Sequence, residues 1–408
     1  MAEPEKKKLK IAISIFMFWP NTGGLQAHAE LLCKYLQERG HDVCVVTRAA
    51  SQPLKGRDFL FFNETVSSLT VKGTKVKPLR FARYWTPLLW LIAKFVIRDA
   101  FRSWGTGLYR IVSRKPARET FAGADIIHHV GEAAPLIGFA AADAARCLNV
   151  PFVVQPTCHP NHYGDTPLDF SLYAGANRLV VHTQYEADFF KQKQMHCPVD
   201  VVGNGIEDRS DGNAQRFREK FGITGPFILF IGRKDSQKGY LLLIEAYKII
   251  HQRQPDIRLV CMGPTVRGVE IEKVEGLFNL EFASEELKHD ALAACTCLCV
   301  PSVGESFGLV FMEAGRYGKP VVARNVAVLR ELLGKDEAGL LLGVPDEKTN
   351  SATLGPDELA AALLKLIADP DECRRLGENC RRVSAQFIWP RIVERFEASY
   401  YRALNHAH

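Results

Sequence analysis

The stretch Glu305-Ser306-Phe307-Gly308-Leu309-Val310-Phe311-Met312-Glu313-Ala314 decides how this chain is expected to fold. It follows the apolar run 297–300, which predicts a buried strand, and its own second half predicts a helix. Glu305 is therefore expected in a strand-to-helix loop and Glu313 about two turns into the helix. The free N–H groups at such a helix start suit a phosphate, and carboxylates beside them accept hydrogen bonds from sugar hydroxyls. The stretch thus predicts a site for a nucleotide-sugar.

Strands and helices alternate along both halves of the sequence. In the first half, apolar runs predict strands at residues 11–18, 42–47, 126–129, 152–155 and 179–182. In the second half they predict strands at residues 227–231, 257–262, 280–282, 297–300 and 321–323. This alternation is typical of α/β folds with doubly wound parallel sheets. The turn signal Gly203-Asn204-Gly205 is expected to separate two such domains.

A longer motif points to a known family. The order strand, Glu-Ser-Phe-Gly, helix, second glutamate, then Gly318-Lys319-Pro320-Val321-Val322 resembles the donor-site signature of retaining glycosyltransferases of the GT-B fold. The resemblance is strongest to glycosyltransferase family 4, the glycosyl transferases group 1. It implies two Rossmann-like domains that face a central cleft. Residues 1–203 would bind the acceptor, completed by a returning helix in residues 388–408, and residues 204–387 would bind the nucleotide-sugar.

Two cations follow the strand predicted at residues 227–231. Arg233 and Lys238 are expected at the carboxyl edge of a parallel sheet, where doubly wound folds bind ligands. Fixed positive charge at that edge suits the negative charge that develops on a departing diphosphate. A solvated basic loop is the other interpretation of this pair.

The resemblance assigns roles to the residues around these loops. It implies that Glu313 binds the ribose hydroxyls and Glu305 the sugar, while Arg233 and Lys238 bind the diphosphate. The rest of the implied donor site is Asn204 at the domain junction, Gly232, and the helix-start residues Ser306, Phe307, Gly308 and Leu309. No nucleophile stands out, so the expected mechanism is a front-face substitution in which the leaving phosphate helps to deprotonate the acceptor.

A glycine pair follows the first predicted strand. Gly23-Gly24 precedes a helical pattern but lacks the three-glycine dinucleotide motif, which disfavours an NAD site. The resemblance places this loop beside the diphosphate, whereas a tight turn is the alternative.

Four histidines are candidates for the acceptor side. His128 and His129 end a predicted strand, so one ring is expected to point to the cleft and the other into the protein. Family members often have His-x-His here, and the His-His-Val of this chain leaves open which ring inherits the catalytic role. A satisfied core histidine is the alternative for either. His159 and His162 could also line the acceptor side.

No obligatory cofactor or metal is expected. Asp369-Pro370-Asp371 has the spacing of a metal motif, but it is expected to form a turn far from the cleft. The eleven cysteines are scattered without metal-ligand spacing, as in proteins of a reducing cytosol. A cytoplasmic protein is therefore expected.

Residues 72–118 form a strongly basic segment, with twelve lysines and arginines against one aspartate in a chain of net charge +6. Thr86-Pro87 predicts a helix start, and Lys94, Arg98 and Arg102 fall on one helical stripe. A basic amphipathic helix with tryptophans suits an anionic membrane surface. The residues expected to contact it are Arg80, Arg83, Trp85, Trp90, Lys94, Arg98 and Arg102. The alternative is a core helix with a wet basic edge, and no nucleic-acid-binding module is recognised.

Together with the resemblance, these features predict a retaining hexosyltransferase that moves a sugar from a nucleoside-diphosphate sugar to a hydroxyl acceptor. The acceptor is expected to be lipid-linked, anionic or a cell-envelope glycan precursor, and the enzyme peripheral at the inner face of the membrane. Two alternatives stay open. A sugar-nucleotide epimerase of the same fold would release epimerised donor without an acceptor, and a non-catalytic sugar-nucleotide-binding protein would turn nothing over.

Overall fold

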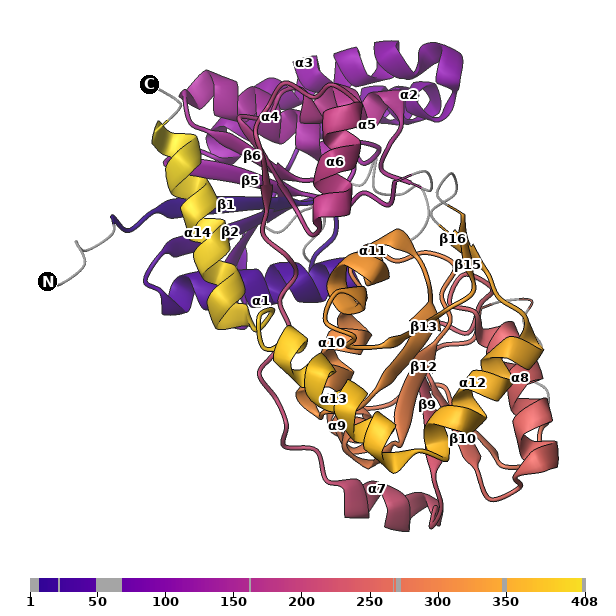
Figure 1. The fold of residues 1–408 in the computed structure, drawn as a ribbon. Helices are drawn as coiled ribbons and strands as arrows, with labels where there is room; N and C mark the ends of the chain where they lie inside the picture. The colour runs from indigo at the N-terminus through magenta and orange to yellow at the C-terminus, as the bar shows by residue number, and fades with distance from the viewer. Residues whose placement is uncertain are drawn as a thin grey trace, which may run out of the picture. The chain divides into compact units, whose positions relative to one another are not determined.

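The chain forms two compact units. The computed structural model describes residues 7–20, 23–48, 68–160, 163–266, 268, 273–346 and 351–405. The first domain comprises Met1–Gly203 and Ile392–His408, and the second comprises Asn204–Arg391. Figure 1 shows that each domain has a central sheet with helices packed around it.

The described part of the first domain is built on an eight-stranded sheet in the order β3-β4-β2-β1-β5-β6-β7-β8. Its neighbouring strands are parallel except β3 and β4, which pair antiparallel. The central strands are buried along almost their whole length, as expected where helices cover both faces of a sheet. The strands are β1 Lys10–Ile15, β2 Asp42–Thr47, β3 Leu69–Val71, β4 Thr74–Pro78, β5 Ile126–Val130, β6 Phe152–Gln155, β7 Arg178–Val181 and β8 Val199–Val201.

The helices of this domain pack apolar faces on the sheet. A single hydrophobic cluster joins Leu89 and Tyr109 of the outer helices to Ile127 and Val154 of the strands. The helices are α1 Gly24–Glu38, α2 Thr86–Ile97, α3 Arg102–Thr120, α4 Ile137–Leu148, α5 Pro167–Tyr173, α6 Gln184–Gln192 and most of α14 Trp389–Asn405.

The second domain carries a parallel sheet in the order β11-β10-β9-β12-β13-β14. A small antiparallel hairpin, β15 and β16, follows β14 in the sequence. Its strands are β9 Phe227–Ile231, β10 Arg258–Met262, β11 Leu277–Leu280, β12 Cys297–Val300, β13 Val321–Arg324, β14 Leu340–Leu342, β15 Val344–Asp346 and β16 Ser351–Thr353. Its helices are α7 Ala214–Phe221, α8 Tyr240–Arg253, α9 Glu285–Ala294, α10 Leu309–Arg316, α11 Ala327–Leu329, α12 Pro356–Ile367 and α13 Pro370–Ser384. The two sheets confirm the prediction of two Rossmann-like α/β domains.

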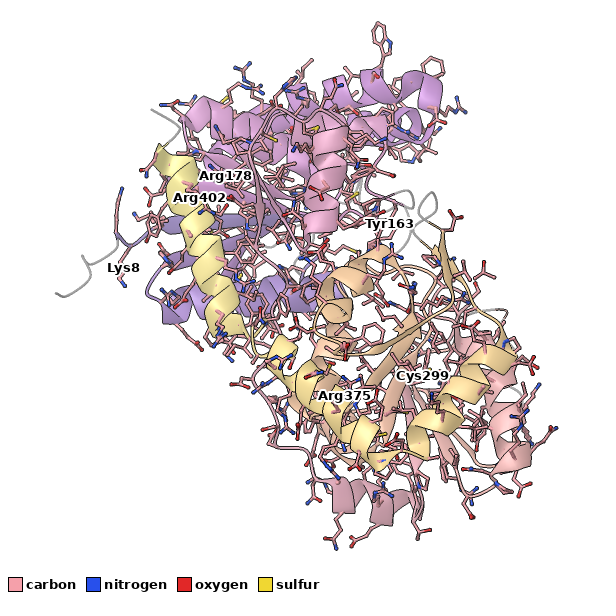
Figure 2. The ribbon with its side chains drawn as sticks, in the orientation of Figure 1. Lys8, Tyr163, Arg178, Cys299, Arg375 and Arg402 are labelled. Atoms are coloured by element: carbon pink, nitrogen blue, oxygen red, sulfur yellow. The ribbon has the colours of Figure 1, made fainter. Side chains whose placement is uncertain are left out.

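The last helix, α14, belongs mainly to the first domain. Glu397 is buried there, accepts from His41 Nε2 at 2.8 Å and forms an ion pair with Arg39 at 2.7 Å. Further along α14, Arg402 lies 3.1 Å from Asp200, which also pairs with Arg178 at 3.0 Å. Figure 2 shows Arg178 and Arg402 near one another in this region. These polar contacts fix the helix in register on the first domain.

The basic segment differs from its prediction. α2 begins at Thr86 as expected but ends at Ile97, and a short 3-10 turn, Asp99–Phe101, separates it from α3. Lys94, Arg98 and Arg102 therefore do not share one helical stripe, and that expectation was wrong. The Arg98 backbone is extended, which breaks the helix at the middle of the three. No helix in the described ranges is long and apolar enough to cross a membrane.

Candidate functional site

The strand order of the second domain reverses between β9 and β12. β10 and β11 lie on the far side of β9, whereas β13 and β14 lie on the far side of β12. The loops that leave these two strands therefore meet at the carboxyl edge of the sheet, the point where doubly wound folds bind ligands. They touch directly, since Val303 N donates to Gln237 O at 2.8 Å.

An ion pair joins the two loops. Lys238 Nζ donates to Glu305 Oε1 at 2.7 Å, and Ser302 Oγ donates to the same oxygen at 2.7 Å. The Glu305 side chain is 6% exposed and the Lys238 side chain 29%. The carboxylate is thus held in place from two sides, while the ammonium keeps access to solvent. The structure brings these two predicted site residues together.

One glycine allows this close approach, and a second allows the turn into α10. Gly239 has φ +71°, and a Cβ there would lie 2.2 Å from Pro301 O. Gly308 has φ +81° and immediately precedes α10, where a Cβ would lie 2.6 Å from Phe311 Cδ2. Phe307 is buried with its ring 5.0 Å from that of Phe387, which anchors the turn. At the start of α10, Phe311 N already donates to Gly308 O at 3.0 Å. The N–H groups of Leu309 and Val310 precede the hydrogen bonds of the helix and can meet an anion.

Arg233, the other predicted cation of this loop, is more open. The Arg233 side chain is 61% exposed and lies 3.2 Å from Asp235 Oδ2. The other oxygen of Asp235 accepts from Lys238 N at 2.8 Å, so this carboxylate shapes the loop that carries both cations. The sequence contains the R-x4-K spacing but gives no sign of the role of Asp235. By contrast Lys234 is fully buried and donates to Leu280 O at 3.0 Å.

Glu313 lies on α10 itself, little more than one turn after its start at Leu309 rather than the two turns expected. Its side chain is 25% exposed and accepts from Lys288 Nζ of α9 at 3.1 Å. Burial raises the pKa of this carboxyl, although Lys288 opposes the shift. Lys288 was not anticipated because a lysine on a neighbouring helix carries no sequence signal. Gly232 opens the β9 loop with its N–H donating to Met262 O, and Asn204 is buried at the start of the domain.

The first domain has its own strand-order reversal, between β1 and β5. Gly23 and Gly24 follow β1, open α1 and are exposed. A Cβ on Gly131, just after β5, would lie 3.8 Å from Leu25 Cδ2, so the two loops are neighbours. The glycine pair therefore lies at the ligand-binding edge of this sheet as well.

Neither strand-end histidine is exposed, so neither ring points to an open cleft as one of them was expected to. His128 Nδ1 lies 2.8 Å from Tyr400 Oη of α14, and burial lowers its pKa well below the usual value. His129 Nδ1 lies 3.2 Å from Ser14 Oγ, and burial lowers its pKa to about 4. Adjacent strand residues face opposite sides, but α14 covers one side and α4 the other, since a Cβ on Gly138 would lie 2.7 Å from His129 Nε2. Both rings are core histidines.

A carboxylate that the sequence analysis passed over lies at this edge instead. Glu132 follows β5 and is half-buried, and burial first, then Asp169, raises its pKa. Among the described residues its carboxylate has no hydrogen-bond or ion-pair partner, whereas its backbone O lies 3.4 Å from His129 Nε2. A half-buried acid without a partner at a ligand-binding edge is a candidate functional group. Its one sequence signal was the position after β5.

The loop after β6 carries the remaining candidates. His159 Nε2 lies 2.7 Å from Tyr163 Oη, and the two residues pair through their backbones. His162 lies outside the described residues. Asp369 caps α13 by accepting from Glu372 N at 3.0 Å, so Asp369-Pro370-Asp371 forms the start of a helix rather than the expected turn.

The fold and these paired loops define the chain as a GT-B protein. A sucrose-phosphate synthase of Thermosynechococcus elongatus superimposes with a TM-score of 0.71 at 18% identity, covering 98% of this chain and 100% of that one. Anabaena HepE in complex with UDP gives a TM-score of 0.70 at 18% identity, covering 97% and 100%. At 18% identity, these similarities show that the chain shares the fold of these two proteins.

Sequence comparison defines the family. The family model "Glycosyl transferases group 1" matches residues 213–383 and "Glycosyltransferase Family 4" matches residues 22–210. The chain belongs to this family of glycosyltransferases. A D-inositol 3-phosphate glycosyltransferase of Frankia alni is 28% identical over 95% of this chain and 96% of its own length. A phosphatidyl-myo-inositol mannosyltransferase of Mycolicibacterium smegmatis is 26% identical over 92% and 90%.

Proposed function

We propose that this glycosyltransferase moves a hexosyl group from a nucleoside-diphosphate sugar to a hydroxyl group of an anionic or lipid-linked acceptor, with retention and without a metal ion. The donor is bound by the second domain and the acceptor by the first. Donor-bound structures of the same fold, such as HepE with UDP-glucose, support the donor class. The family itself supports transfer of a sugar.

The Lys238–Glu305 pair at the strand-order reversal carries this proposal. Glu305 is buried and held by Ser302, so its second oxygen has a fixed position from which to accept a sugar hydroxyl. Lys238, 29% exposed, and Arg233, 61% exposed, supply solvent-accessible positive charge on the loop after β9, and Lys238 contacts the loop that leads into α10 through Glu305. This combination suits a diphosphate joined to a sugar. Glu313, which Lys288 holds in place, is proposed to accept hydrogen bonds from the ribose hydroxyls of the donor.

The proposed reaction is a front-face substitution. The bond between the sugar C1 and the diphosphate oxygen breaks while the acceptor oxygen bonds to C1 on the same face. The proton of the acceptor hydroxyl goes to the departing phosphate oxygen, so no enzyme nucleophile is needed. Arg233 and Lys238 stabilise the charge that develops on the leaving diphosphate. His128 and His129 have no proton-transfer role here, because both rings are buried in the core.

The relatives support an anionic acceptor. Their names describe enzymes that act on D-inositol 3-phosphate and on phosphatidyl-myo-inositol, which share an inositol ring with a phosphate. On the first domain, Gly23-Gly24 and Glu132 lie at one ligand-binding edge. Exposed glycine N–H groups suit the phosphate, and Glu132 is placed to accept from an acceptor hydroxyl.

The test is a panel of UDP- and GDP-sugars read by release of nucleoside diphosphate. Each donor is assayed alone, with inositol 3-phosphate, and with phosphatidylinositol vesicles, and the product anomer is assigned by NMR. We expect acceptor-dependent release with the anomeric configuration of the donor. Release of an epimerised donor without acceptor would establish the epimerase alternative, and nucleotide-sugar binding with no turnover on any acceptor would establish the non-catalytic one. An inverted product would refute retention.

A further inference from the structure

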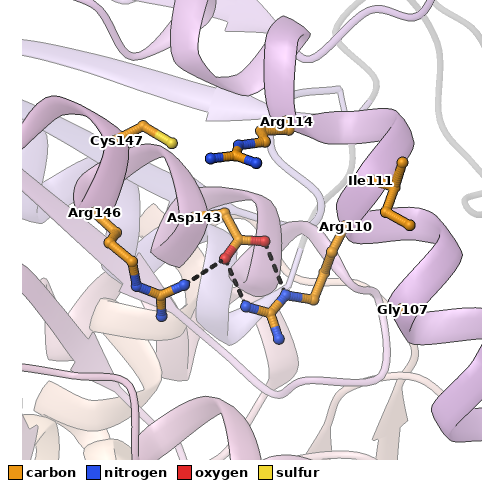
Figure 3. A pocket seen from close by; sticks show the side chains of 7 residues that line it. All are labelled: Gly107, Arg110, Ile111, Arg114, Asp143, Arg146 and Cys147. Atoms are coloured by element: carbon orange, nitrogen blue, oxygen red, sulfur yellow. Dashed lines mark hydrogen bonds and ion pairs between the residues drawn. The ribbon is translucent and has the colours of Figure 1, made fainter.

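A hollow of about 400 Å³ lies between α3 and α4 of the first domain. Arg110, Arg114 and Ile111 line it from α3, and Asp143, Arg146 and Cys147 line it from α4. Figure 3 shows the guanidinium groups of Arg110 and Arg146 meeting the carboxylate of Asp143. It also shows Arg114 on the wall formed by α3.

The hollow carries excess positive charge, and one carboxylate orders part of it. Asp143 accepts from Arg110 Nε and Nη2 at 2.8 and 2.6 Å and from Arg146 Nη1 at 3.1 Å. One carboxylate thus orders two guanidinium groups, and Arg114 has no ion-pair or hydrogen-bond partner among the described residues. Planar guanidinium groups match the oxygens of phosphate, and preordering two of them lowers the entropic cost of binding. The chemistry of the hollow therefore suits a phosphate.

This hollow is separate from the ligand-binding edge of the sheet. α4 starts after the carboxyl end of β5 and runs back to the amino end of β6, so Asp143 to Cys147, in its second half, lie toward the amino ends of the strands. α3 likewise leads into the amino end of β5. Gly23, Gly24 and Glu132 lie at the opposite edge. A phosphate in the hollow would not be the acceptor phosphate at that edge.

Exposed apolar side chains are concentrated in the segment that includes α2 and the first half of α3, and one of them, Ile111, lines the hollow. Half of the exposed large hydrophobic residues in the described ranges lie within residues 84–111: Tyr84, Trp90, Leu91, Ile97, Phe101, Trp104 and Ile111. Trp104, Ile111 and Arg114 follow the spacing of one helical face of α3, and the first two are 74% and 73% exposed. An apolar stripe that ends at arginines is the arrangement of helices that lie in a membrane interface.

We propose that the outer face of α2 and α3 lies on an anionic membrane and that the arginine hollow takes the phosphate of a lipid headgroup. Trp104 and Ile111 enter the interface, while Arg114 and Arg146 meet the phosphate at headgroup depth. The charge of the segment that carries this face, twelve basic residues against one acidic, complements an anionic leaflet. Of the residues first expected at the membrane, Arg83, Trp90, Lys94 and Arg98 are exposed and Arg80 is exposed before α2. Two belong elsewhere: Trp85 packs partly against the core, and Arg102 donates to Val96 O.

Vesicle sedimentation without donor or acceptor tests this proposal independently of the reaction. We expect the protein to pellet with phosphatidylcholine vesicles containing phosphatidylglycerol, to stay in solution with phosphatidylcholine alone, and to be released by salt. Arg114→Gln should weaken binding by about five-fold or more, the effect of one basic residue at such a surface. Arg118→Gln removes the same charge from the same helix but outside the hollow, so it should weaken vesicle binding less than Arg114→Gln does. Equal losses for the two variants, or a protein that stays in solution at low salt, would overturn the proposal.

Cys147 gives a second readout on the unaltered protein. It lines the hollow and is the one cysteine of the eleven that is exposed. Alkylation of Cys147 should slow when phosphatidylglycerol vesicles are added, and it should not slow with inorganic phosphate. Equal protection by inorganic phosphate would identify a site for free phosphate and refute the lipid assignment, and no protection by either would refute an occupied hollow.

Discussion

Replacing Glu305 by glutamine distinguishes the contacts proposed for the sugar from those proposed for the nucleotide. The Lys238 Nζ to Glu305 Oε1 distance of 2.7 Å corresponds to about 6 kcal/mol of attraction at an effective dielectric of 20, which is a ceiling before desolvation. Because Lys238 is partly exposed, the net contribution expected is that of a charged hydrogen bond, about 1.5–3 kcal/mol. Glutamine keeps the shape and the bond from Ser302 Oγ but removes the charge. The free energy of unfolding should fall by no more than this amount.

The functional effects should differ between ligands. Without the carboxylate, Lys238 keeps its access to a diphosphate, so Glu305→Gln should leave the Kd of free UDP or GDP unweakened. Turnover of the intact donor should fall by about 10²–10³, because the sugar loses a contact made in the transition state. Glu313→Ala should instead weaken the free nucleotide itself by about 1.5–3 kcal/mol.

Calorimetric titration with the free nucleotide and initial rates with the donor give the two readouts. Ser302→Ala is the matched control, since it removes the other partner of Glu305 without changing the charge. If Glu305→Gln and Glu313→Ala weaken free nucleotide binding equally, the division between sugar and ribose contacts is refuted.

Three further outcomes are expected. Arg233→Ala should lower turnover by about 10²–10³ with an unchanged melting temperature, because the side chain is 61% exposed; wild-type turnover would remove it from the leaving-group site. EDTA should leave activity within a factor of about two, and loss that manganese restores would reveal a metal-dependent reaction. Glu132 has a raised pKa, so the folded state holds its proton more tightly than the unfolded state does, and the stability that this gives is lost as pH rises through the raised pKa. As pH rises through the raised pKa, the Glu132→Gln variant should therefore gain free energy of unfolding relative to the unaltered protein. It should also flatten the acid limb of the pH profile of kcat/KM for the acceptor. Identical pH profiles for the two proteins would exclude Glu132 from the acceptor site.

Local patterns predicted most of the sheet. Buried parallel strands read as continuous apolar runs, so 42–47, 152–155, 227–231 and 297–300 coincide with β2, β6, β9 and β12. The edges were harder, because β11 is Leu277–Leu280 rather than 280–282, and the three-residue edge strands β3, β8 and β14 are too short for a periodic pattern to be recognised. Short edge strands depend on a neighbouring strand that the sequence pattern does not show.

The candidate site was predictable where it is local. The loops after β9 and β12 could be placed from their motifs, and their meeting follows from strand order, which gives the Lys238–Glu305 pair its geometry. The prediction for the two histidines was wrong because of a contact between residues far apart in the sequence. Strand alternation correctly turns His128 and His129 to opposite faces, but Tyr400, 272 residues further along the chain, covers one of them. A helix that returns from the end of the chain cannot be seen in the local pattern of the strand it covers.

The path of α14 has a consequence for how the protein is made. The chain leaves the first domain after Gly203 and comes back to it only at Ile392, after the whole second domain. During synthesis the first domain therefore lacks Tyr400 and Glu397, the partners of His128 and His41, until α14 has left the ribosome. The second domain, by contrast, is contiguous and can close on itself earlier. The first and last segments of the second domain pair with each other, since Ile206 N donates to Phe387 O and Trp389 N donates to Ile206 O. Nascent chains stopped before residue 392 should accordingly hold a protease-resistant second domain and a protease-sensitive first one.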